Sequence, residues 1–403
     1  MAQQPRIAIE GFSGLHNTVS PKSLKTGQLW EAVNVDHDDS GMVGRRDGYT
    51  LYQPTNTTAH SLWTDGATMY YRFGNSLVSQ IPGQAQIILR SDMPQGLITS
   101  FVQVANRIYY SDGITSGIIE QGVNRTWGLT RPAMPSLAAS GGSLYAGRYR
   151  VALSYVRKDG QESGLSQEAT MTITDGGIKI TYLASLDPTV NGIYIYASKH
   201  DGTEFYRLGL VANQSGSYTY AFTGDLMMIP ARFITMTAPP AMSGLTWFNG
   251  RIFGFSELTL YWTNALAYEL FDPNSNWMPF EADIQCIGAV EDGLYVGTSN
   301  KIWFLSESSY NGVPVFMPRI VADYGATGAQ ALGDSAWLQE GGQVGKAWHV
   351  ITRRGEAVGL REGTFTNRTE DIYSFPTDEF SFGAVINRGG TNYFYTYNPF
   401  ESE

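Results

Sequence analysis

The chain has 403 residues, of which 42% are hydrophobic, and this is enough apolar material to build a sizeable core. Charged residues make up only 16%, against about a quarter in typical domains, while glycine and tyrosine are plentiful, a composition that favours strands and tight turns. The net charge of −10 argues against a protein that grips nucleic acid through its phosphates, because such a protein needs a basic face.

Near the N-terminus, residues 36–47 form an acidic loop. Oxygen-bearing side chains occupy positions 1, 3, 5 and 12 of an EF-hand-type spacing, with glycine at position 6: Asp36, Asp38, Ser40, Asp47 and Gly41. Ca²⁺ takes six to eight oxygen ligands, so the four oxygen-bearing residues are a candidate calcium site. The flanking sequence predicts no helices, and Asp replaces Glu at position 12. A β-turn built by the Asp-Asp-Ser-Gly run is therefore the preferred interpretation.

Paired segments with a two-residue alternation then recur along the chain. Each pair flanks a short polar turn at Asp65-Gly66, Ala105-Asn106, Asn249-Gly250 or Asp292-Gly293. Asn-Gly and Asp-Gly favour two-residue hairpins, because a type I′ turn needs positive φ at both central residues. The second segment of each pair carries aromatic residues, and a third often follows, as in residues 301–305. Such a degenerate all-β repeat is typical of propeller blades.

The middle of the chain has a different character. Pro132 and Pro135 open a Ser/Gly-rich stretch, and Pro239-Pro240 closes the region. Between them lie about seven short strand-like segments in ~100 residues, the number and spacing of an immunoglobulin-like sandwich.

The sequence therefore predicts an all-β chain in which a β-propeller-like domain carries an inserted immunoglobulin/fibronectin-like β-sandwich. Residues 1–132 form the first part of the propeller, residues 133–240 the insert, and residues 241–403 the second part. Without the insert roughly 300 residues remain, enough for six or seven blades of about 40–50 residues.

The sequence shows no catalytic motif. The five histidines show no metal-ligand spacing, and the sequence contains no G-x-S-x-G elbow and no P-loop. The single cysteine, Cys286, lies in an apolar segment and is predicted to be buried in the core. We expect no enzyme activity and no cofactor. Two alternatives stay open: a receptor-binding propeller that recognises host surface glycan, and a propeller glycosidase.

The N-terminal segment has the most specific pattern. Residues 9–17 (IEGFSGLHN) are followed by Ser20-Pro21, by residues 28–36 (QLWEAVNVD) and by residues 41–49 (GMVGRRDGY). This segment resembles the opening of phage tail nozzle, tail tubular and packaged-DNA-stabilisation proteins. Residues 245–254 and 292–305 resemble the same group, and residues 145–164 resemble the fibronectin-like inserts of phage tails.

The resemblance implies a virion component of a short, podovirus-type tail, made in the host cytoplasm. Copies of such a protein form a closed ring, usually a hexamer, below the portal and the head-to-tail adaptor. The ring extends the channel for double-stranded DNA, retains the packaged genome and releases it at ejection, and it can carry tail fibres or spikes. No segment approaches the ~18–20 apolar residues of a membrane span, so we expect no membrane insertion.

Overall fold

The computed structural model describes residues 11–33, 35–37, 42–46, 59–310, 313–334, 345–373, 382–388 and 391–397. Within these ranges the protein is all-β: many small antiparallel sheets, three short 3₁₀ helices and no α-helix. No helix among these residues is long and apolar enough to cross a membrane.

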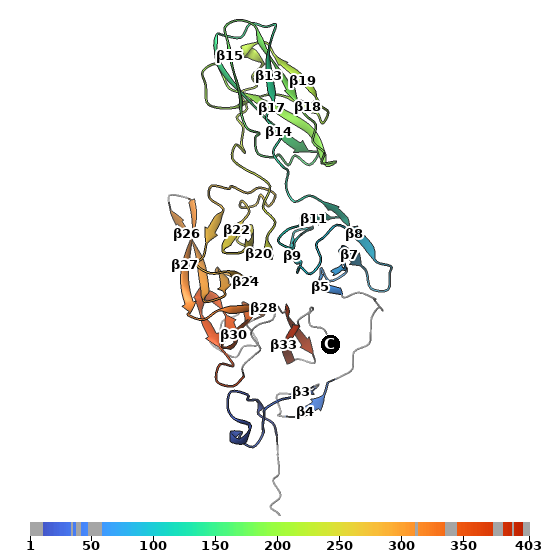
Figure 1. The fold of residues 1–403 in the computed structure, drawn as a ribbon, viewed down its shortest axis with the longest axis vertical. Helices are drawn as coiled ribbons and strands as arrows, with labels where there is room; N and C mark the ends of the chain where they lie inside the picture. The colour runs from blue at the N-terminus through green and yellow to red at the C-terminus, as the bar shows by residue number, and fades with distance from the viewer. Residues whose placement is uncertain are drawn as a thin grey trace, which may run out of the picture.

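Two small sheets lie at the N-terminal end of the molecule (Figure 1). The first is parallel and the second antiparallel, and a 3₁₀ turn lies between the strands of the first: β1 (Gly14–Leu15) with β2 (Gln28–Leu29), η1 (Pro21–Ser23), and β3 (Val35–His37) with β4 (Val43–Arg45). The Thr18 hydroxyl donates a hydrogen bond of 2.7 Å to the Asp371 carbonyl, so this region is tied to a turn late in the chain.

Five four-stranded antiparallel sheets follow the order of the chain, each strand pairing with the next. They are β5 (Ala59–Thr64), β6 (Met69–Phe73), β7 (Ser76–Gln80) and β8 (Ile87–Arg90); β9 (Ser100–Val104), β10 (Arg107–Ser111), β11 (Ser116–Glu120) and β12 (Val123–Arg125); β20 (Ser243–Phe248), β21 (Arg251–Ser256), β22 (Thr259–Trp262) and β23 (Trp277–Pro279); β24 (Ile284–Ala289), β25 (Gly293–Thr298), β26 (Ile302–Tyr310) and β27 (Val313–Ala322); and β28 (Ala326–Asp334), β29 (Lys346–Thr352), β30 (Gly355–Gly359) and β31 (Phe365–Asn367), with η4 (Arg361–Gly363) between the last two. A two-stranded sheet, β32 (Phe382–Arg388) with β33 (Thr391–Tyr397), completes the set.

These six sheets, which we call the body, are arranged around a common centre with the first strand of each facing inward (Figure 1). Apolar clusters fill the space between successive sheets. One cluster joins the β5–β8 and β9–β12 sheets, a second joins β9–β12 to β20–β23, a third joins β20–β23 to β24–β27, and a fourth joins β24–β27 to β28–β31. Successive side chains of a strand point to opposite faces of its sheet. A sheet with a neighbour on each side therefore contributes side chains to two apolar clusters.

The predicted hairpins are confirmed, and Asn249-Gly250 forms the expected two-residue turn with positive φ at both residues. The two-residue turn predicted at Asp65-Gly66 is wrong, because Thr64 pairs with Met69 and the loop covers residues 65–68. Trp63 pairs with Tyr70 across Asp65-Gly66, and Phe248 pairs with Arg251 across Asn249-Gly250. The Asp65 carboxylate accepts the backbone N–H groups of Ala67 and Thr68 at 2.9 and 2.7 Å, which is the local reason that an aspartate opens this turn.

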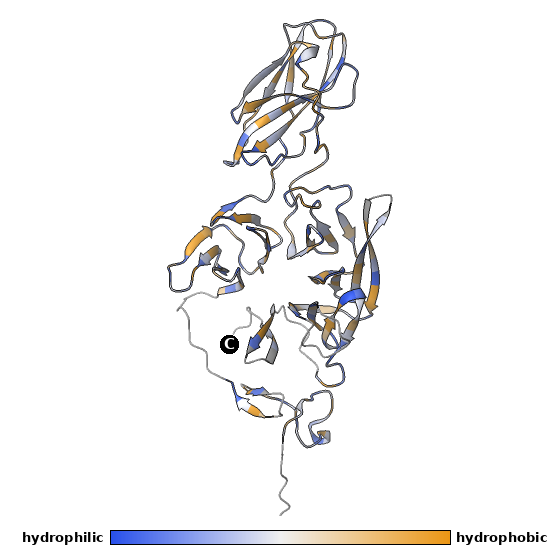
Figure 2. Cartoon of the chain, turned by 180° about the vertical axis from the view of Figure 1, so that it is seen from behind, coloured by the Kyte–Doolittle hydropathy of each residue, from blue (hydrophilic) through white to orange (hydrophobic). Residues whose placement is uncertain are grey.

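The region between the proline-rich stretches forms a separate two-sheet module that extends from one end of the body, opposite the N-terminal sheets (Figures 1 and 2). One sheet has the order β13-β16-β19 and the other β15-β14-β17-β18. The strands are β13 (Ser136–Ser140), β14 (Gly147–Arg157), β15 (Ala169–Ile173), β16 (Gly177–Tyr182), β17 (Val190–Ala197), β18 (Tyr206–Ala212) and β19 (Gly216–Tyr220), followed by η2 (Thr223–Asp225). Residues of both sheets share one core, which includes Tyr149, Ile178, Ile195 and Tyr220.

Candidate functional site

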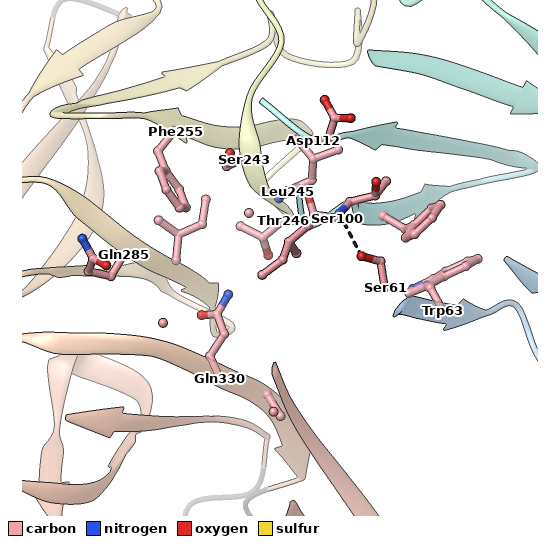
Figure 3. Close-up of a pocket in the computed structure, with 18 of the residues that line it drawn as sticks. Ser61, Trp63, Ser100, Asp112, Ser243, Leu245, Thr246, Phe255, Gln285 and Gln330 are labelled. Carbon is pink, nitrogen blue, oxygen red and sulfur yellow. Dashed lines mark hydrogen bonds between the residues drawn. The ribbon is translucent and has the colours of Figure 1, made fainter. Parts of the chain in front are cut away.

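The body has a central cavity of about 870 Å³ that is open to solvent (Figure 3). Its wall is built mainly from the first strand of each of the six sheets, β5, β9, β20, β24, β28 and β32, and from the segment that precedes β9. Asp112, which follows β10, and Phe255 of β21 complete it. Residues far apart in the sequence therefore meet here. They include Ser61, Trp63, Leu97, Ser100, Leu245, Thr246, Gln285, Gln330 and Val385.

The polar side chains of the wall are mostly uncharged, and several connect neighbouring sheets. The Ser100 hydroxyl donates to the Ser111 carbonyl at 3.1 Å and accepts the Leu245 N–H at 3.0 Å, which links β9 to β20. Gln330 accepts the indole N–H of Trp348 at 2.7 Å. Ser100 thus connects two sheets, whereas the Gln330 bond lies within the β28–β31 sheet.

Ser61, within β5, has a strained backbone conformation. Its φ of 56° falls in the left-handed region, at a β-bulge where the pairing with β6 shifts register. The Thr99 N–H donates to the Ser61 hydroxyl at 3.0 Å, the contact drawn as a dashed line in Figure 3. Nδ1 of His60 lies 2.9 Å from the same hydroxyl. Burial, and then the charge of Arg72, lower the pKa of His60 below its ordinary value of 6.5, so the ring is neutral at pH 7.

Among the described residues that line the cavity, Asp112 is the only one with an acidic or basic side chain. It is fully buried and forms an ion pair of 3.2 Å with Arg72, which is equally buried. Two backbone N–H groups, of Ile114 and Thr115, also donate to Asp112 at 3.0 and 2.6 Å. Its charge is therefore compensated inside the protein, and the cavity presents a neutral wall.

A second charged cluster lies outside the cavity, where the insert joins the body. Glu269, which is 2% exposed, accepts hydrogen bonds from three arginines. Arg107 and Arg125 belong to β10 and β12 of the body and reach Glu269 at 3.3 and 2.9 Å. Arg157, at the end of β14 in the insert, is the third and also contacts Asp187 of the insert at 3.6 Å. The cluster therefore connects the loop between β22 and β23 to the β9–β12 sheet and to the insert.

The candidate calcium loop is described only in part. Asp36 is paired with Arg46, whose Nε lies 2.9 Å from the carboxylate, while Asp38, Ser40 and Asp47 lie outside the described residues. Elsewhere in the described ranges no group of three or more His, Cys, Asp or Glu side chains is placed to hold a metal ion. The calcium hypothesis and the turn interpretation both stay predictions.

Cys286 fulfils its prediction as a core residue. Its side chain is 1% exposed, and burial raises the pKa of the thiol to about 12. The cavity wall and the Glu269 cluster were not predicted from the sequence. Part of the wall lies on the first segments of the predicted hairpins, as with Trp63, Leu245 and Gln285, but nothing in the sequence indicated that these segments meet. An isolated glutamate in a loop carries no pattern.

Comparisons with known proteins identify no family. No protein-family model matches the sequence, and no curated protein matches it. Among solved structures, one similar chain is the extracellular domain of a putative one-component system from B. thetaiotaomicron, with 8% sequence identity and a TM-score of 0.18. The match covers 83% of this chain and 57% of that one, so this chain spans little more than half of its length. A likeness of this strength leaves the family of the chain unassigned.

Proposed function

We propose that this chain is a structural subunit of a short phage tail, which assembles into a nozzle-like ring below the portal and adaptor. The ring extends the DNA channel, retains the packaged genome and lets it pass at ejection. In this proposal the body is a six-bladed β-propeller and the insert an immunoglobulin/fibronectin-like sandwich. The segment at residues 9–49 supports the tail assignment through its resemblance to tail nozzle proteins.

The arrangement of the sheets supports the propeller. Five successive four-stranded meanders and one hairpin surround a cavity, their first strands form its wall, and apolar layers separate neighbours. Radial repetition of this kind leaves only the outer strand of each sheet as a free edge. The seven strands of the insert form two sheets over one core, as expected for the sandwich.

The observation that carries the structural role is the exposed apolar surface on outer strands of the body. Ile87 and Ile88 on β8 are 62% and 60% exposed, and Met317 on β27 is 57% exposed. Edge strands with exposed aliphatic side chains are a liability in a free monomer and are normally covered. Such surface favours a protein that functions between other subunits.

The size of the cavity supports a channel between copies. At about 870 Å³ the cavity is within the range of small-ligand pockets, roughly 300–1,000 Å³, and is far too small for double-stranded DNA. A DNA channel must therefore lie on the axis of several copies. Among the described residues of the wall, Asp112 is the one carboxylate, whereas a glycosidase requires two, which weighs against the glycosidase alternative for this cavity.

The test is the mass of the purified 44.3 kDa chain, alone and with the portal and adaptor of the same virion, followed by negative-stain images. A ring with an axial opening, alone or on the portal–adaptor complex, is the expected result. A chain that stays monomeric with those partners, or a trimer that binds surface polysaccharide at micromolar strength, would replace the proposal with the receptor-binding alternative.

A further inference from the structure

We propose that the central cavity of the body is a binding site for an uncharged, mostly apolar small molecule. The inference concerns a single copy of the chain and goes beyond the proposed function, because every copy in a ring would contain the same cavity.

The size of the cavity suits a small molecule. It measures about 870 Å³ and is open to solvent, so a ligand can enter without a change in the fold. Cavities of roughly 300–1,000 Å³ bury most of the surface of a drug-sized ligand. Because the first strands of six sheets converge here, one bound molecule would contact strands that are far apart in the sequence, such as β5 and β28.

The wall carries aliphatic side chains that are exposed to solvent. Leu62 on β5 and Leu332 on β28 both line the cavity, and they are 67% and 45% exposed. Leu97 and Val385 add apolar surface to the same wall. Covering such side chains with an apolar ligand is favourable, because the gain grows with the apolar area removed from water.

Aromatic rings add flat apolar surface on two sides of the cavity. Trp63 stacks on Phe101, with ring centroids 6.0 Å apart and planes at 20°. Phe255 lies on the other side of the cavity from Trp63 (Figure 3). Aromatic side chains pack well against other rings in offset or edge-on contacts, so the wall favours a ligand that contains a ring.

Two amide side chains supply polarity. Gln330 extends from β28 into the cavity (Figure 3), and the indole N–H of Trp348 fixes its Oε1 at 2.7 Å. The Gln285 Nε2 on β24 donates to the Asp283 carbonyl at 3.4 Å, near the limit for a hydrogen bond. These amides suit a ligand with a few polar groups. A sugar would instead place hydroxyls against apolar side chains on several sides, and each unpaired hydroxyl would cost free energy.

The charge of the wall excludes ions. Asp112 is the one acidic or basic side chain among the described residues of the wall, and Arg72 and two backbone N–H groups compensate its charge. A charged ligand would therefore lose its water without gaining a counter-charge, which is unfavourable. The site should discriminate between two molecules of the same shape that differ in charge.

Two dyes provide that comparison. N-phenylnaphthylamine is uncharged, and anilinonaphthalenesulfonate has the same ring system with an added sulfonate. In a titration of the full chain, the fluorescence of the uncharged dye should rise and saturate with one-to-one stoichiometry. The sulfonate should bind about tenfold more weakly or worse, because it brings a charge to a neutral wall.

Lysine substitutions locate the bound dye. Leu332→Lys and Leu62→Lys each place a cation on the wall, from two different sheets, at side chains that are already exposed. Each should weaken binding of the uncharged dye and strengthen binding of the sulfonate, so that the preference shifts about tenfold or more toward the sulfonate. Urea unfolding curves check that both variants fold. Ile88→Lys is the matched control, since Ile88 is 60% exposed on β8 and does not line the cavity, and it should bind both dyes like the wild type.

Three results would overturn the proposal: no binding of the uncharged dye, equal binding of both dyes, or an unchanged preference in both wall variants. Loss of binding in Ile88→Lys would do the same, because it would place the dye on the β8 edge. None of these results affects the tail-ring proposal, which is tested by mass and images of the assembly.

Discussion

Arg72 and Asp112 form an ion pair in which both side chains are fully buried. Asp112→Asn keeps the shape and removes the charge, which leaves the Arg72 guanidinium uncompensated among the Thr99 hydroxyl and the Pro94 carbonyl. Breaking one partner of a buried pair costs about 3–5 kcal/mol, so we expect a loss of that size in the free energy of unfolding, measured in urea.

The control for this substitution is Asp92→Asn. Asp92 also pairs with an arginine, Arg90 at 2.5 Å, but its side chain is 69% exposed. Exposed pairs contribute about 0–1 kcal/mol, so this variant should unfold nearly like the wild type. If the two variants lost the same free energy of unfolding, burial of the Arg72–Asp112 pair would add nothing to its contribution to stability.

The stability should also depend on pH through His60. Burial and then Arg72 lower the pKa of His60 below 6.5 in the folded state. Between that lowered pKa and 6.5 the unfolded chain binds a proton that the folded chain does not, so stability falls as pH drops below 6.5. His60→Gln should lessen the loss between pH 7 and pH 5 in urea titrations. A variant with the same pH slope as the wild type would contradict this assignment.

For single residues, the sequence predicts burial in the core better than it predicts ion-pair partners. Cys286 was predicted to be buried because apolar residues surround it, and its side chain is 1% exposed. The Arg72–Asp112 pair joins residues 40 positions apart in two different sheets. No local sequence pattern predicts such an ion pair, because it depends on how neighbouring sheets pack against each other.

Turn chemistry explains why most hairpins were predictable. Asn249-Gly250 forms the two-residue turn that its sequence favours. At Asp65-Gly66 the loop is longer, and the prediction of the hairpin held because the flanking alternation sets the register. The fourth strands were not predicted. β12 and β23 have only three residues each, too few for an alternation to be recognised, and they pair because the third strand already offers an edge. The irregular segment that precedes β23 likewise has no sequence pattern that predicts the contacts of Glu269 with three arginines.

At the scale of elements, Glu269 should fix the insert to the body. Glu269→Gln leaves the guanidinium groups of Arg107, Arg125 and Arg157 together with less compensating charge, so the junction should loosen. We expect faster limited proteolysis at the two connections near Pro132 and Pro239, and unfolding of the insert in a transition separate from that of the body.

Glu168→Gln is the matched control, since Glu168 pairs with Arg150 within the insert at 3.3 Å and is 39% exposed at its side chain. It should leave both the proteolysis rate and the unfolding curve unchanged. If Glu269→Gln behaved in the same way, the junction would be held by its backbone contacts alone.

For the whole molecule, composition and repeats predicted an all-β chain, and the structure agrees. The central cavity could not be foreseen, because its wall combines the inward strands of six sheets and depends on how they close. The two connections between the body and the insert lie side by side. A side-chain carbon at Gly128, where φ is 80°, would lie 2.9 Å from the Ala238 Cα, so the chain leaves and re-enters the body at nearly the same point.

This close approach predicts that the insert can be removed. A chain in which residues 130–236 are replaced by a short glycine linker should still fold, because the apolar layers of the body do not include the insert. Residues 129–237 alone should also fold around their own core. Calorimetry of both fragments should give cooperative transitions, and a body without one would show that it depends on the insert for stability.

The same point of exit and re-entry affects how fast the body can fold. The Met242 N–H donates to the Ser111 hydroxyl across 131 residues of sequence, and contacts of such separation are slow to form because a long loop must close first. Once the insert is folded, it holds Gly128 and Ala238 close together. The loop that must close before Ser111 meets Met242 is then much shorter than the sequence separation. We therefore expect the insert to fold before the body closes. Substitutions that weaken its core should slow closure of the body, while removal of the whole insert should speed it.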